Sequence, residues 1–165
     1  MAELTNLESK IAEVLGLAEA SKGATETVKG MLDADEHELA GTLERMHEQA
    51  AETEKRCTEV AGTFDGKKTA ILEAAREAKR EATEMMETYL AEDEDALDGF
   101  EFLTMAEAGE VGHWAIVKKL NERAANDSVK ELAGWALPIQ EEHLTTVMKG
   151  ALHLAAGEDP NETAE

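Results

Sequence analysis

Carboxylate, amide and imidazole side chains interrupt the apolar faces of the last two helices that the sequence predicts. They are Glu107, Glu110 and His113 in the first group and Gln140, Glu142 and His143 in the second. A buried carboxylate is costly unless it is paired, hydrogen-bonded or bound to a metal ion. Carboxylate and imidazole side chains that converge inside a helix bundle are a known way to build a metal site. Metal binding is therefore the chemistry that these residue types suggest.

The spacing of the first group places its members on one side of a helix. Glu107, Glu110 and His113 follow one another every three residues, so they stack on a single face. The same face carries the apolar residues Phe100, Leu103, Val111, Trp114 and Val117. We therefore expect the three polar side chains to point toward the interior of the protein.

Two earlier glutamates meet the same test for an inward position. Glu8 lies at helical spacing from Leu4, Ile11 and Leu15, and Glu36 lies at helical spacing from Leu32, Leu39 and Leu43. Together with the two later groups, they give four helices that each offer a polar residue to the interior. This pattern predicts one polar layer shared by four helices.

Apolar periodicity of about 3.6 residues runs through almost the whole chain and predicts five helices. We expect them over residues 5–21, 25–62, 67–90, about 96–125 and about 127–156. Lys22-Gly23 is expected to end the first helix, with Thr25 beginning the second. The acidic stretch Glu92-Asp93-Glu94-Asp95 is expected to cap the fourth helix, and Asn126-Asp127-Ser128 is expected to cap the fifth. We predict a single all-α domain over residues 1–157 and an acidic tail over 158–165.

The composition excludes several classes of partner. The formal net charge is −21, from 37 acidic and 16 basic residues, which disfavours nucleic acid and anionic membrane surfaces. Cys57 is the only cysteine, so the chain has no internal disulfide and no cysteine metal cage. The amino-terminal residues do not resemble a signal peptide, and no apolar run is as long as a membrane span. We expect a cytoplasmic protein.

At these residues the chain resembles the ferritin-like superfamily of carboxylate-bridged di-metal four-helix bundles. It looks closest to the small bacterial stress-associated ferritin-like proteins, and rubrerythrin-type domains are more distant. The resemblance is carried by the segments Leu7-Glu8-Ser9, Asp35-Glu36-His37-Glu38, Glu107-Ala-Gly-Glu110-Val-Gly-His113-Trp114 and Gln140-Glu141-Glu142-His143. It implies a four-helix bundle with an additional crossover helix over residues 67–90. It also suggests a homodimer.

The resemblance further implies two bound metal ions and matches some, but not all, of the family's ligands. Glu8, Glu36, Glu107 and His143 stand at positions of metal ligands. Leu39 stands where a histidine would follow Glu36. Gln140 stands where a glutamate would precede His143, and an amide is a weak ligand that cannot bridge two cations. Glu110, His113 and Glu142 are the residues that could replace the missing ligands.

Two interpretations of the polar residues follow. In the first, they bind two iron ions, with manganese or zinc as other candidates, and the iron is oxidised by peroxide or oxygen in a stress response. In the second, they form a metal-free hydrogen-bonded layer that fixes helix register in a non-catalytic acidic scaffold. The helix over 67–90 also has two interpretations: a crossover outside the bundle, or a bundle member that leaves the first helix as an arm.

Overall fold

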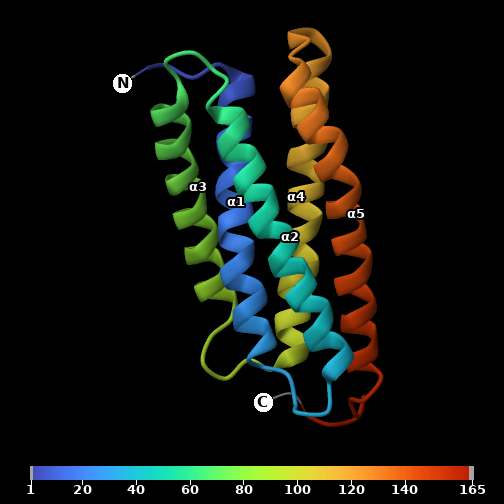
Figure 1. Ribbon diagram of the computed structural model, residues 1–165. Coiled ribbons are helices and arrows are strands. Elements are labelled where there is room, and N and C mark those ends of the chain that lie inside the picture. Colours follow the sequence, from blue (N-terminus) through green and yellow to red (C-terminus); the bar gives the residue numbers. More distant parts are fainter. Residues whose placement is uncertain (1, 164–165) are drawn as a thin grey trace.

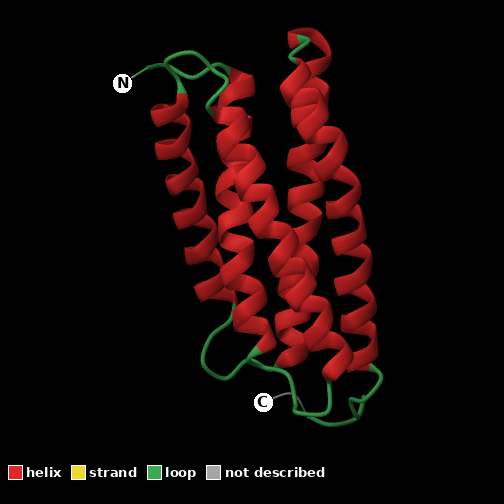
Figure 2. Cartoon of the chain, viewed as in Figure 1, coloured by secondary structure: helices red, strands yellow, loops and turns green. Residues whose placement is uncertain are grey.

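The computed structural model describes residues 2–163 and contains five α-helices and no strand within that range (Figures 1 and 2). The helices are α1 (Asn6–Lys29), α2 (His37–Ala61), α3 (Lys68–Tyr89), α4 (Ala96–Ala124) and α5 (Asp127–Ala155). The all-α prediction is therefore confirmed. Of the acidic tail predicted over 158–165, the last two residues lie outside the described range.

Helices α1, α2, α4 and α5 form a four-helix bundle, and α3 packs on its outside. Helix α1 packs against α2, α3 and α4, while α5 packs against α2 and α4. Figure 1 shows that α2 and α4 run in the same direction and that α3 runs in the opposite direction, at the outer edge of the molecule beside α1. Of the two interpretations of this helix, the structure has the outer crossover, and α1 is a full member of the bundle.

The boundary predicted between the first two helices is wrong. Helix α1 continues through Lys22-Gly23 to Lys29, and α2 begins only at His37. Thr25 is fully buried, and its hydroxyl donates hydrogen bonds to the carbonyls of Ser21 and Lys22 at 3.0 and 2.9 Å. A threonine bonded back to the preceding turn lies inside a helix, whereas a capping threonine accepts a bond from the turn that follows.

The other helix ends lie within two residues of their predicted positions. Clear capping residues mark two of these ends, the starts of α4 and α5. Asp95 and Asp98 form a reciprocal capping box at the start of α4. The Asn126 side chain accepts a hydrogen bond from the Val129 amide at 3.1 Å and caps α5. Ala125, with φ of 53°, makes the left-handed turn between these two helices.

Helix α3 is held close to α1 by a glycine. A Cβ atom at Gly16 would lie 2.3 Å from the carbonyl oxygen of Ala75, so only glycine allows this approach. Ala70, Ile71 and Ala75 are the buried residues of α3, and they all belong to its first two turns. The second half of α3 is packed more loosely against the bundle.

The apolar core consists of two clusters. One surrounds the fully buried residues Ile11, Leu15, Cys57, Ile71 and Trp114, and the other surrounds Val28, Leu43, Phe100 and Leu103. In α4 and α5 the buried residues between the two clusters are polar, and in α2 they include Thr53 beside Ala50. Within the described residues, none of the helices is long and apolar enough to cross a membrane.

Candidate functional site

A polar layer separates the two apolar clusters and joins three helices. We define it as Gln49 of α2, Glu107 and Glu110 of α4, and Gln140 and His143 of α5. The Gln140 amide donates a hydrogen bond to Glu107 Oε2 at 2.8 Å, and His143 Nδ1 lies 3.4 Å from the same oxygen. His143 Nε2 lies 2.7 Å from Gln49 Oε1. Glu107 is therefore the centre of a network that connects α2, α4 and α5.

The His143 ring faces an oxygen atom on each side. Nε2 is within hydrogen-bond distance of the Gln49 amide oxygen, and Nδ1 is at ion-pair distance from the Glu107 carboxylate. The Nδ1 contact lacks the alignment of a hydrogen bond. His143 therefore links Gln49 of α2 to Glu107 of α4 through the two sides of one ring.

Glu110 lies beside this network, and only 6% of its surface is exposed. Burial raises the pKa of its carboxyl group well above the usual value, and the neighbouring Glu107 carboxylate raises it further. The pKa of the Cys57 thiol is also raised, by burial and by the charge of Glu110. Both groups therefore favour their protonated, uncharged forms.

Unsatisfied hydrogen-bonding atoms gather in the same region. Four buried side-chain atoms of the described residues have no hydrogen-bond partner: Glu107 Oε1, His113 Nδ1, Trp114 Nε1 and His143 Nδ1. All four belong to α4 or α5 at or next to the polar layer. Buried polar atoms are normally paired. His113 Nδ1 and His143 Nδ1 lie at ion-pair distance from a carboxylate oxygen, so Glu107 Oε1 is the acceptor of this group that has no partner among the described residues.

Glu8 is buried as predicted, but it lies at the start of α1. Its carboxylate accepts a hydrogen bond from the Thr5 amide at 2.7 Å and completes a capping box. Lys67 Nζ lies 3.9 Å from the same carboxylate oxygen. Glu8 is therefore held by a helix cap and a lysine, and it belongs to no group with Glu107.

Glu36 lies at the opposite end of the bundle. The prediction that it points inward from within a helix is wrong. Since α2 begins at His37, Glu36 is the residue that precedes the helix. Its two carboxylate oxygens each lie 3.2 Å from Nε2 of His153, near the end of α5. The incorrect helix boundary is the reason for the incorrect position.

The remaining predicted residues are divided between the interior and the surface. Gln140 and His143 are buried as predicted, whereas Glu142 is exposed. His113 is half-buried, and its Nδ1 lies 3.1 Å from Glu13 Oε2 of α1. Its face of α4 turns toward α1, so His113 lies apart from His143.

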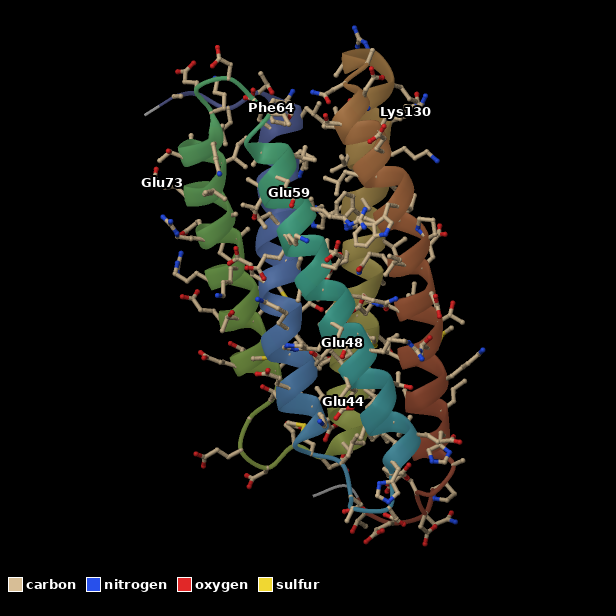
Figure 3. All side chains as sticks on the ribbon, viewed as in Figure 1. Glu44, Glu48, Glu59, Phe64, Glu73 and Lys130 are labelled. Carbon is tan, nitrogen blue, oxygen red and sulfur yellow. The ribbon has the colours of Figure 1, made fainter. Side chains whose placement is uncertain are left out.

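Two further polar side chains contact the predicted residues and were not predicted from the sequence. Gln49 bonds to His143, and its position between Met46 and Thr53, both buried, was the available signal. Glu13 pairs with both Lys10 and His113 from the side of α1. By contrast, the charged residues Glu44, Glu48 and Glu59 of α2 are on exposed faces (Figure 3).

A groove leads from the surface to the polar layer. It lies between α3 and α4, has α1 as its floor and encloses about 490 Å³. Most of its lining is apolar and includes Leu17, Met86, Phe102 and Ala106. Glu107 and Glu110 line it as well. We call it the α3–α4 groove.

The donor set implied by the resemblance does not gather at one place. Among residues 2–163, no three histidine, cysteine, aspartate or glutamate side chains form a group that could hold a metal ion. Glu8 and Glu36 are held at opposite ends of the bundle, and Gln140 donates to Glu107 where a second carboxylate is needed. These residues do not fit a two-iron centre.

Comparisons of the chain with protein-family models, with curated proteins and with solved structures find no match. Membership of the ferritin-like superfamily therefore stays a prediction from the sequence segments.

Proposed function

We propose that the protein is a non-catalytic helical binding or scaffold protein whose interior polar layer is metal-free. The observation that supports this proposal is the network around Glu107. Gln140 and His143 both direct nitrogen atoms at one carboxylate oxygen, and Gln49 accepts from the other side of the imidazole. Gln49, Gln140 and His143 thus each contact a polar partner within the layer.

Such a layer has a structural use. A slip of α2, α4 or α5 by one turn would separate Gln49, Glu107 and His143 and leave each buried without its partner. An unpaired buried polar group costs about 1–3 kcal/mol, and more if it is charged. The layer therefore favours one register of the three helices, while the apolar clusters on either side supply most of the stability.

Metal content tests this proposal. The protein, purified without a histidine tag, is incubated anaerobically with Fe(II), Mn(II) or Zn(II), desalted and analysed by mass spectrometry of the metal. We expect far less than one ion per chain and an unfolding free energy unchanged by EDTA. One or more ions per chain, lost in Glu107→Gln but retained in the surface variant Glu48→Gln, would contradict it.

A second candidate function is the binding of a single metal ion between Glu107 and His143 in a ferritin-like bundle. It is favoured by Glu107 Oε1 and His143 Nδ1, which are buried without hydrogen-bond partners among the described residues. Two ligands about 2.1 Å from one ion at a tetrahedral angle lie about 3.4 Å apart. His143 Nδ1 and Glu107 Oε2 are separated by 3.4 Å. The experiment above distinguishes the two candidates.

A further inference from the structure

We propose that the α3–α4 groove binds a small aliphatic amine, with its ammonium group at Glu107 and Glu110 and its alkyl chain along α4. The inference rests on the proposed metal-free layer, because a metal ion at Glu107 would occupy the carboxylate that the ammonium needs. It goes beyond that proposal by naming a site and a class of ligand.

The inner part of the groove offers unpaired acceptors. Glu107 is 1% exposed, its Oε1 atom has no hydrogen-bond partner within residues 2–163, and it lines the groove. Glu110 lines the groove beside it. An ammonium group has three N–H donors, so one such group can satisfy an oxygen of each carboxyl group. A purely apolar ligand would leave Glu107 Oε1 unpaired.

The charges that face the groove favour a cation. Its ionisable lining residues include four glutamates, one lysine and one histidine, which are Glu13, Glu81, Glu107, Glu110, Lys10 and His113. Lys10 and His113 both pair with Glu13, at 2.6 and 3.1 Å, and are thus directed at that residue. The net charge of −21 adds repulsion for any anion. A fatty acid, which carries a negative charge, is therefore disfavoured as a ligand of the groove.

The apolar part of the groove has the length of a medium alkyl chain. From Glu110 back to Phe102, α4 rises about 12 Å, because each helical residue adds about 1.5 Å. Met86 of α3 and Ala24 of α1 line this stretch together with Phe102 and Ala106. Methionine side chains adapt readily to the shape of an alkyl chain. The enclosed volume of about 490 Å³ lies within the usual range for small-molecule pockets.

Two glycines of α4 provide a matched pair of variants. Gly109 lines the groove, and a Cβ atom there would meet nothing within 4 Å, so a leucine has room to extend into the groove. Gly112 is equally open, lies three residues further along and is not part of the groove lining. Leucine has a better helix propensity than glycine, so we expect Gly109→Leu and Gly112→Leu both to fold.

The probes are octylamine, octanol and octanoate, added below their micelle concentrations to EDTA-treated protein at pH 7. Binding is followed by ¹H–¹⁵N NMR, and circular dichroism checks the fold of each variant. We expect saturable octylamine binding with shifts at Ala106 and Gly109, weaker octanol binding and no octanoate binding. Gly109→Leu should abolish octylamine binding and Gly112→Leu should preserve it. A bound ammonium group favours the ionised form of the neighbouring Glu110 carboxyl group. Glu110→Gln removes that charge and should weaken octylamine binding by about tenfold, the scale of one charge-assisted hydrogen bond, without weakening octanol binding.

Four results would overturn this inference. Equal binding of octylamine and octanol would show an apolar groove that does not recognise a cation. Octylamine binding that survives Gly109→Leu would show attraction to the acidic surface. Self-association that Gly109→Leu abolishes would show that a second copy of the chain occupies the groove. If metal-free protein fails to bind octylamine, the amine site is refuted and the proposed function is unaffected. Stoichiometric metal content would instead refute the proposed function.

Discussion

At the scale of single residues, burial separates Glu107, Glu110 and Cys57 from the many ionisable groups on the surface. Glu107 and Cys57 are almost completely inaccessible, and Glu110 is 6% exposed. Burial is the main reason that the pKa values of Glu110 and Cys57 are raised. The sequence predicts that Glu107 and Glu110 point inward and allows a hydrogen-bonded layer with Gln140 and His143, but it does not predict that Gln49 contacts this histidine. To predict which side chains of the layer contact one another, one must know how α2, α4 and α5 are rotated relative to one another.

Cys57 should be chemically protected in the folded protein. Its side chain is 0% exposed and its thiol pKa is raised, so little reactive thiolate is available. We expect reaction with a disulfide reagent at pH 8 to be at least ~100-fold slower than for an exposed cysteine, and to be limited by opening of the bundle. Gly112→Cys in a Cys57→Ala background supplies the exposed reference. Similar rates for the two cysteines would contradict the buried position.

At the scale of helices, local capping signals predict boundaries well when the caps are polar and exposed. Asp95 and Asn126 are such residues, and α4 and α5 begin next to them. The prediction fails at Lys22-Gly23 because a glycine followed by a threonine also fits inside a helix that is buried on several sides. Ala24, Thr25 and Val28 are buried against neighbouring helices, and this tertiary packing outweighs the local signal. The position of Glu36 could not be predicted for the same reason.

Gly23→Ala tests whether α1 continues through this position. Gly23 has open space around its Cα atom, so alanine should raise the free energy of unfolding by about 0.5–1 kcal/mol through its better helix propensity. Gly66→Ala is the control, because Gly66 has a φ of 67° and alanine there should be destabilising. Urea unfolding measures both variants. A loss of stability in Gly23→Ala comparable to that in Gly66→Ala would place a break at Gly23.

At the scale of the whole molecule, two apolar clusters form the core of the bundle and a polar layer lies between them. The sequence predicts a polar layer of four helices, but the structure places Glu8 and Glu36 at the two ends of the bundle. Both residues lie at helical spacing from apolar residues. Periodicity alone does not distinguish positions in the middle of a helix from positions at its ends. The layer thus joins three helices, and α1 contributes the floor of the groove beside it.

The central claim is that this layer holds protons in place of a metal ion, and the pH dependence of stability tests it most directly. Glu110 has a pKa that is raised in the folded state above its unfolded value near 4.5. The folded protein therefore binds the proton more tightly, and this stabilisation is fully present below pH 4.5 and is lost as the pH rises through the folded pKa.

Urea unfolding of the wild type, Glu110→Gln and Glu48→Gln should be compared from pH 4.5 to pH 9 in EDTA. Glu48 is exposed, so Glu48→Gln makes the same change in formal charge at the surface. We predict that Glu110→Gln gains stability relative to the wild type as the pH rises, by more than about 1 kcal/mol in total, since one unit of pKa corresponds to about 1.4 kcal/mol. A difference independent of pH, or one equal to that of Glu48→Gln, would contradict a layer that holds protons.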